Sequence, residues 1–255
     1  MTEKPQYGQQ VTFCVAETLM ELQTQKASIE YVRTRMHGNM LLMNGEVQFS
    51  TLDEGRYHGM MTREYENIEP GHRVLILGGG DGLLARDVYI FGNDNIESIT
   101  LVDYDQEFVE AFSMHYPVNE GSLVDIRTRL VFEDAVKFLS ESNEKFDSIL
   151  VDLPDPDGPE MQALYFNVFS LLFNVMKPST FVVSHVGPVS LNPSHPNWAF
   201  ISRLKRDVSY VFNCAPEFSY KFIPSFSHEW GFLKFKQNEI AQRNSSDIDF
   251  IYHTL

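Results

Sequence analysis

The first part of the chain alternates between apolar and polar positions. Residues 28–34 alternate with a period of two, as a half-buried β-strand does. Two apolar runs follow on either side of Asn44-Gly45, and such a pair is typical of a tight β-hairpin because both of its residues take positive φ. A stretch at 54–65, rich in Tyr, Arg, Glu and Met, is expected to be a linking helix. We therefore predict a small N-terminal β domain over residues 1–66.

The pattern changes after residue 72, where short apolar runs alternate with stretches of helical length. Strands are expected at 74–77, 98–102, 130–132, 148–151 and 180–186, and helices at 83–91, 106–115, 135–142, 161–176 and 198–207. The aromatic segment 218–235 is expected to add an antiparallel pair of strands. Strand–helix alternation of this length predicts an α/β fold with a Rossmann-like, doubly wound and mainly parallel sheet over residues 67–255.

The charge of the chain limits its partners. Asp and Glu number 35 against 20 Lys and Arg, a net charge of −15. Such a field repels phosphate backbones and anionic lipids and attracts cations, so we expect neither nucleic acid nor membrane partners. The two cysteines form no metal-binding or disulfide pattern, the N-terminus lacks an apolar leader, and no apolar run approaches the ~20 residues that span a bilayer. A cytoplasmic location is expected.

A glycine-rich loop at residues 78–82 follows the first predicted strand of the larger domain. Glycines at such a strand end let a ligand approach the backbone. Asp103, which ends the next strand, is placed to accept hydrogen bonds from ribose hydroxyls, so we expect a nucleoside. The loop also matches a dinucleotide fingerprint, which leaves NAD open. However, the carboxylate of Asp81 would repel a pyrophosphate or the carboxylate of intact S-adenosylmethionine and would attract an ammonium group.

An acidic segment follows the strand at 148–151. Asp152 stands at the strand tip, and Asp155 and Asp157 lie in a loop stiffened by three prolines. A cation would relieve the repulsion among these carboxylates, and one of them could take a proton from an amine. We assign Asp157 to turn chemistry. The carboxylates could hold a divalent ion, but no histidine or further acid joins them at a recognisable spacing, so no metal is predicted.

Three parts of the chain together resemble the polyamine aminopropyltransferase family of spermidine and spermine synthases. These parts are residues 41–48 with 53–58, residues 74–87 with 101–105, and residues 147–165. The resemblance covers roughly residues 20 to 235. It implies a small β domain on a class I methyltransferase-like domain, and a homodimer or homotetramer formed through the N-terminal hairpins.

The resemblance also implies the reaction. An aminopropyl group would pass from decarboxylated S-adenosylmethionine, a co-substrate, to a cationic amine such as putrescine, releasing methylthioadenosine. No permanently bound cofactor and no metal would be needed. The implied donor-binding residues are Gln48, Gly78, Gly80, Asp81, Asp103 (ribose), Asp134 and Ala135 (adenine), and Pro159 and Leu164, which would flank the adenine. The implied amine-binding residues are His58, Asp81, Asp155 and Phe226. Asp152 would be the catalytic base, with Tyr57 helping to orient the attacking nitrogen.

Several positions depart from the family pattern. Gly59 replaces a usual Glu, Leu83 a glycine and Asp103 a Glu, while Ser184-His185 stands where Gln is frequent. The segment at 223–232 is one residue shorter than usual and has Phe226 in place of Tyr. The acceptor amine therefore stays open. Two alternatives also stay open: an S-adenosylmethionine-dependent small-molecule methyltransferase, and a non-catalytic paralogue that binds a nucleoside or a polyamine.

Overall fold

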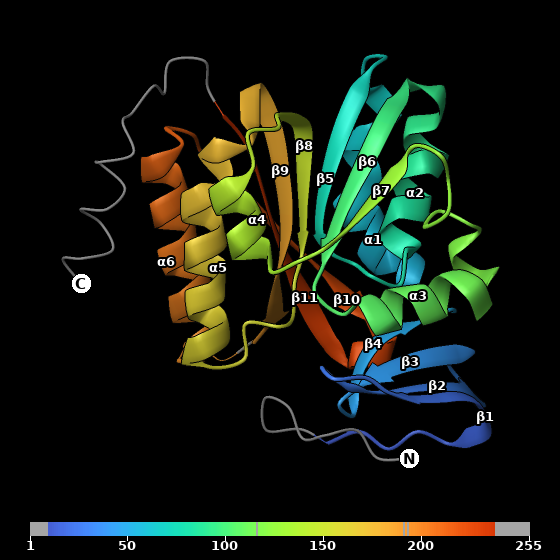
Figure 1. Ribbon diagram of the computed structural model, residues 1–255. Coiled ribbons are helices and arrows are strands. Elements are labelled where there is room, and N and C mark those ends of the chain that lie inside the picture. The colour runs from blue at the N-terminus through green and yellow to red at the C-terminus, as the bar shows by residue number, and fades with distance from the viewer. Residues whose placement is uncertain (1–9, 116, 191, 193, 238–255) are drawn as a thin grey trace.

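The computed structural model describes residues 10–115, 117–190, 192 and 194–237. Within them the strands form a four-stranded and a seven-stranded sheet, and the smaller sheet lies across one end of the larger (Figure 1). None of the described helices is long and apolar enough to cross a bilayer.

The smaller sheet is antiparallel, in the order β1-β2-β3-β4. Its strands are β1 (Val15–Gln23), β2 (Ser28–Thr34), β3 (Asn39–Met43) and β4 (Glu46–Ser50). The predicted hairpin is confirmed, because Asn44 and Gly45 join β3 to β4 with φ of 53° and 79°. Strand β1 was not predicted. It pairs on one side only, with β2, and none of its residues is buried, so its sequence lacks the alternation of a half-buried strand.

The larger sheet has the order β10-β11-β9-β8-β5-β6-β7. Its strands are β5 (His72–Gly78), β6 (Ile96–Asp103), β7 (Thr128–Phe132), β8 (Phe146–Asp152), β9 (Met176–Val189), β10 (Glu217–Ile223) and β11 (His228–Lys236). Strands β5 to β9 are parallel, while β10 and β11 are antiparallel. The chain winds outward from β5 in both directions, which confirms the doubly wound fold. Ligands bind such sheets where the strand order reverses, here between β5 and β8.

Helices cover both faces of the larger sheet (Figure 1). One face carries α1 (Glu54–Thr62), α2 (Leu83–Gly92) and α3 (Gln106–His115), and the other carries α4 (Ala135–Glu141), α5 (Pro159–Leu171) and α6 (Pro196–Val211). The central strands read as continuous apolar runs because both of their faces are buried. The predicted helix over 161–176 is wrong in its last turn. Helix α5 ends at Leu171, a 3-10 turn follows, and Met176 opens β9.

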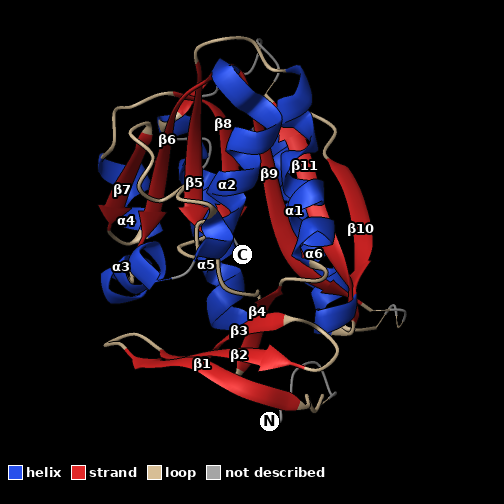
Figure 2. Cartoon of the chain, turned by 90° about the vertical axis from the view of Figure 1, so that its right-hand side faces the viewer, coloured by secondary structure: helices blue, strands red, loops and turns tan. Residues whose placement is uncertain are grey.

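The smaller sheet covers the carboxyl ends of the parallel strands. The arrowheads of β5, β6 and β7 point toward it in Figure 2. The Oγ1 atom of Thr24, in the smaller sheet's first turn, donates a buried 2.7 Å hydrogen bond to Asp105, just beyond β6. Tyr31 packs edge-on against Phe112 of α3 with ring centroids 5.7 Å apart. The domain boundary at residue 66 stays a prediction, and α1, which precedes it, packs on the larger sheet.

Candidate functional site

A cavity of about 390 Å³ lies where the two sheets meet. Residues at the ends of β5, β6 and β8 form one wall, and the β3–β4 hairpin with Gln48 forms another. Almost all the site residues predicted from the sequence line this one cavity. They are Gln48, Tyr57, His58, Gly78, Gly80, Asp81, Asp103, Asp134, Ala135, Asp152, Asp155, Leu164 and Phe226.

Two glycines allow the strand ends to come this close. Gly78 is the register partner of Asp152 and has a φ of +84°. A Cβ on Gly78 would lie 2.0 Å from the carbonyl oxygen of Asp152, and one on Gly80 would lie 2.6 Å from Oδ2 of Asp103. Larger residues would therefore push the backbone at the tip of β8 and the carboxylate of Asp103 away from the loop.

The cavity is strongly acidic. Among the described residues that line it there are eight acidic side chains and no Lys or Arg: Glu46, Asp81, Asp103, Asp105, Glu133, Asp134, Asp152 and Asp155. Burial raises the pKa of Asp81 to about 6 and that of Asp103 to about 6. Both carboxylates are thus costly to ionise in the free protein, and a cationic ligand would repay that cost.

Tyr57 of α1 and Asp152 of β8 form the closest polar pair of the site. The Tyr57 hydroxyl donates a 2.5 Å hydrogen bond to Oδ1 of Asp152. Burial, and then the charge of Asp152, raise the pKa of Tyr57 well above its ordinary value, so the hydroxyl keeps its proton. The ring of Tyr57 packs edge-on against Phe226 at 6.0 Å and Phe232 at 5.4 Å. These contacts fix the hydroxyl in place beside the carboxylate.

The aromatic wall beside Tyr57 is held by a buried carboxylate. Asp53, which precedes α1, accepts hydrogen bonds from Ser225 at both oxygens, from the backbone N–H at 2.6 Å and from Oγ at 2.9 Å. Ser225 and Phe226 belong to a 3-10 turn (Pro224–Phe226), so this contact places Phe226 against Trp230, with ring centroids 4.7 Å apart. Asp53 is therefore a positioning residue for the apolar side of the cavity.

The predicted nucleoside contacts lie along the ends of β6 and β7. Asp103 accepts a 2.9 Å hydrogen bond from the backbone N–H of Asp105. Asp134 caps α4 through a 3.0 Å bond from the backbone N–H of Lys137. Pro159 is not brought to the site. It is exposed at the first position of α5, where a missing N–H is tolerated, and Met161 lines the cavity in its stead.

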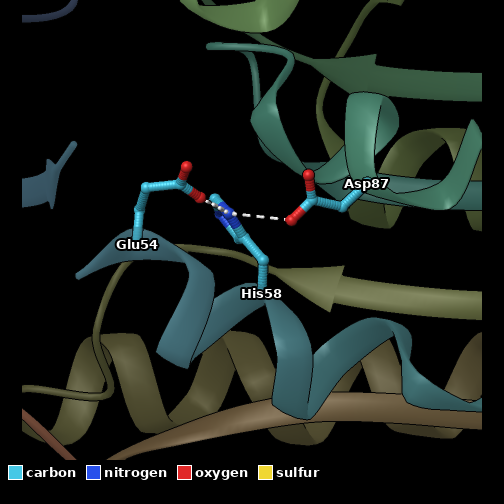
Figure 3. Close-up of side chains that lie close together, drawn as sticks. All are labelled: Glu54, His58 and Asp87. Carbon is cyan, nitrogen blue, oxygen red and sulfur yellow. Dashed lines mark hydrogen bonds and ion pairs between the residues drawn. The ribbon is translucent and has the colours of Figure 1, made fainter. Parts of the chain in front are cut away.

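A second charged cluster consists of Glu54, His58, Arg86 and Asp87, of which only His58 lines the cavity. Glu54, His58 and Asp87 bring one ligand atom each within 4.8 Å of one another, as a metal site would (Figure 3). However, Arg86 donates to both oxygens of Glu54 at 2.8 and 2.9 Å and to Oδ1 of Asp87 at 2.7 Å. Nδ1 of His58 lies 2.6 Å from Glu54. These cations already neutralise the carboxylates, so the residues fit an ion-pair network better than a metal ion.

Three of the cavity residues that were not predicted as site residues bear on its chemistry. His185 of β9 bonds through Nε2 to the carbonyl oxygen of Leu153 at 2.6 Å, and Trp230 of β11 stacks on its ring. Met161 is the third. A polar residue near the end of a predicted strand was the available signal for His185. Trp230 gave none, because the sequence does not show which strand pairs with β9.

Comparison with known proteins identifies the family of this chain. A family model described as "Spermine/spermidine synthase domain" matches residues 54–246. A polyamine aminopropyltransferase of Oceanobacillus iheyensis is 35% identical over 217 residues, which cover 83% of this chain and 39% of the relative. Another, of Thermococcus onnurineus, is 30% identical over 227 residues, which cover 89% of this chain and 78% of the relative. The chain thus spans less than half of the first relative's length and most of the second's.

A solved structure also matches the fold. A spermidine synthase in complex with the transition state analogue AdoDATO is similar with a TM-score of 0.78 and 19% sequence identity. The match covers 94% of this chain and 78% of the solved one. At this identity the likeness shows a shared fold.

Proposed function

Because the chain belongs to the spermine/spermidine synthase family, we propose that it transfers the aminopropyl group of decarboxylated S-adenosylmethionine to an amine such as putrescine. Methylthioadenosine is the other product. One observation carries the proposal: the Tyr57–Asp152 pair opens onto an acidic cavity with no Lys or Arg among its described lining residues. Such a cavity suits two substrates that both carry positive charge.

The donor occupies the half of the cavity near β6 and β7. Asp81 binds the ammonium of the aminopropyl group, and Asp103 binds the ribose hydroxyls. Gly78 and Gly80 let the donor approach the backbone closely. The remaining donor contacts are Gln48 at the nucleoside end, Asp134 with Ala135 at the adenine amino group, and Leu164 with Met161 on the adenine face.

The acceptor amine occupies the half near α1. His58, Asp155 and Phe226 line it, and Asp155 and Asp81 supply negative charge for the amine's cationic groups. Phe226 and Trp230 cover its alkyl chain. Two positions that differ from the family pattern, Gly59 and Phe226, lie on this side of the cavity. We therefore expect this chain to differ from its relatives mainly in which amine it accepts.

The reaction follows from these positions. The neutral nitrogen of the acceptor attacks the methylene next to the sulfonium of the donor. A C–N bond forms, the C–S bond breaks, and its electron pair goes to sulfur, which leaves as a thioether. Asp152 takes the proton that the nitrogen loses. The Tyr57 hydroxyl holds the Asp152 carboxylate in line, and the alignment of two bound substrates supplies much of the rate.

Methyl transfer is disfavoured by the same charges. Intact S-adenosylmethionine carries a carboxylate where its decarboxylated form has only hydrogen, and that carboxylate would lie near Asp81. We therefore expect the decarboxylated form to bind more tightly. A non-catalytic role is disfavoured because the Tyr57–Asp152 pair is complete.

The proposal extends to the protein's location, cofactor use, assembly and domain division. We place it in the cytoplasm, where its free thiols Cys14 and Cys214 stay reduced. We propose that it uses no permanently bound cofactor and works as a homodimer or homotetramer built through its N-terminal hairpins. We also propose that residues 1–66 and 67–255 form its two domains.

One incubation tests the proposed function. The full chain is mixed with decarboxylated S-adenosylmethionine and a panel of amines, and products are read by mass. Methylthioadenosine and an amine heavier by one aminopropyl group are expected. D152N should lose about 10²–10⁴-fold in kcat, while D157N, an exposed acid of the same loop, should keep full activity. Absence of product with every amine, or full activity of D152N, contradicts the proposal.

A further inference from the structure

His185 lies on the cavity wall but has no part in the reaction proposed above. Its β9 neighbour Ser184 is the register partner of Val151, so His185 stands next to the end of β8, where Asp152 lies. The side chain is 2% exposed. A buried imidazole beside a catalytic base is either a packing residue or a ligand contact. Which of these roles His185 has is decided by whether both of its ring nitrogens already have hydrogen-bond partners.

The tautomer of His185 is fixed by its neighbours. Nε2 lies 2.6 Å from the carbonyl oxygen of Leu153 and 2.8 Å from the hydroxyl oxygen of Tyr165. A carbonyl oxygen can only accept, so Nε2 must carry the hydrogen. Burial lowers the pKa of His185 and outweighs the charge of Asp152, so the ring is neutral near pH 7. Nδ1 is then a bare acceptor.

That acceptor is unsatisfied. Nδ1 of His185 is buried and has no hydrogen-bond partner among the residues the structure describes. Buried polar atoms in native proteins are nearly always paired, and His185 lines the cavity, so we take its unpaired Nδ1 as the contact point for a ligand group. Since Nδ1 carries no hydrogen, the missing group must be a donor.

The surroundings narrow the class of that donor. The ring of Trp230 stacks on His185 at 6.3 Å with a 26° interplanar angle, and the ring of Tyr57 lies 5.9 Å away. Aromatic faces attract cations. Because the carboxylate of Asp152 is close by, this space favours an N–H donor that is positively charged, or one that has just given up its proton. An amine meets these conditions, whereas a hydroxyl would gain nothing from the charge.

We propose that Nδ1 of His185 accepts a hydrogen bond from an amine nitrogen of the acceptor substrate and thereby helps to select it. The inference rests on the proposed function and adds a specificity-determining residue to it. The family pattern noted in the sequence has Gln where this chain has Ser184-His185, and an amide side chain both donates and accepts. The imidazole of His185 uses its Nε2 hydrogen for the carbonyl oxygen of Leu153 and offers the substrate only the acceptor Nδ1. It therefore favours substrate nitrogens that bear hydrogen.

Equilibrium binding tests this without turnover. Putrescine, cadaverine and spermidine are titrated into the full chain saturated with methylthioadenosine, which has no group to transfer. H185F keeps an aromatic ring but lacks the acceptor, and its affinity for the amine that binds best should fall about 10- to 100-fold. H185Q offers an amide oxygen and should recover most of that loss. Y165F removes the other partner of Nε2 but leaves Nδ1, and should bind like the unchanged protein.

A second readout follows His185 directly. In ¹⁵N-histidine protein, the Nδ1 resonance should show an unprotonated nitrogen and should move when the amine binds. Equal amine affinity in H185F, binding of none of the three amines by the unchanged protein, or an Nδ1 signal that carries a proton would each overturn the inference. If H185F loses amine affinity but the unchanged protein transfers nothing, only the proposed function fails.

Discussion

The hydroxyl of Tyr57 donates a 2.5 Å hydrogen bond to Oδ1 of Asp152, although the two residues are 95 positions apart in the chain. The bond joins α1 to the tip of β8 and places a protonated phenol against the carboxylate that we propose as the base. A donor held this firmly restricts the carboxylate to one orientation. The hydroxyl occupies Oδ1, which leaves the other oxygen of the carboxylate to take the proton.

Replacing Tyr57 with Phe tests this relationship. Y57F keeps the ring contacts with Phe226 and Phe232 but removes the hydroxyl, so kcat should fall about fivefold, in line with about 1 kcal/mol for one hydrogen bond. The melting temperature should change little. Y220F, which alters an exposed tyrosine of β10, serves as the control. Unchanged kcat in Y57F would show that the hydroxyl does not orient the base.

The buried carboxylate of Asp81 predicts a pH dependence of donor binding. Burial raises its pKa to about 6. Below that pH the group is neutral and cannot attract an ammonium, so the affinity for decarboxylated S-adenosylmethionine should fall as pH drops from 7.5 through 6. Calorimetry across this range measures it. Methylthioadenosine, which lacks the ammonium, should show a weaker dependence, due to Asp103 alone.

The same carboxylate should destabilise the free protein. A folded pKa above the unfolded value of 3.8 means that the folded state binds more protons, so stability falls as pH rises from about 4 to about 6 and stays reduced above it. The rise corresponds to at most about 3 kcal/mol. D81N should therefore raise the melting temperature at pH 7.5 and lose donor affinity. D157N should do neither, and a D81N protein less stable than the original would contradict the argument.

The sequence predicted the parts of this protein that depend on local pattern. The Asn44-Gly45 hairpin and the run of parallel strands follow from turn chemistry and periodicity. Asp81, Asp103 and Asp152 could be grouped in advance because the carboxyl ends of parallel strands lie at one edge of a sheet. The roles assigned to them stay proposals.

The sequence did not reveal features that depend on distant pairing. His185 and Trp230 meet only because β11 pairs with β9, and no local pattern specifies that register. Strand β1 was missed because it has no buried face. The α5 helix was extended too far because residues 172–176, apolar apart from Asn174, suit either a helix or a strand, and the structure uses Met176 in β9.

Gly78 should tolerate no side chain. Its φ is +84°, and an added Cβ would lie 2.0 Å from the Asp152 carbonyl oxygen. G78A should cost more than the roughly 1 kcal/mol of a positive φ alone, and should lower activity because the strand tip carrying Asp152 must move. Urea unfolding and kcat are measured together.

Two other glycines separate the causes of the loss in G78A. Gly158 also has positive φ, +90°, but a Cβ there would contact nothing within 4 Å, so G158A isolates backbone strain. Gly59 lies inside α1 with open space and ordinary φ, so G59A should stabilise the protein by about 0.5–1 kcal/mol. If G78A proves no worse than G158A, the contact with Asp152 does not limit the loop.

The ion-pair network behind His58 predicts a shift that can be measured on one residue. Burial alone would lower the pKa of His58, but its 2.6 Å contact with Glu54 and the charges of Asp87 and Asp81 together outweigh burial, so the pKa lies above its ordinary value. The stability this contributes is fully present below about pH 6.5 and is lost as pH rises through the folded pKa. E54Q should therefore lower the His58 pKa, read by NMR titration.

The same substitution should also weaken the fold, because it leaves Arg86 with one carboxylate partner where it had two. The Glu54 side chain is only 13% exposed, so the unfolding free energy should fall by about 2–4 kcal/mol, more than an exposed ion pair is worth. E66Q changes an exposed acid just beyond α1 and should stay within about 0.5 kcal/mol of the original. A His58 pKa that is the same in E54Q as in the original would mean that Glu54 does not set its charge, and the imidazolium facing Asp81 would then need another source of stabilisation.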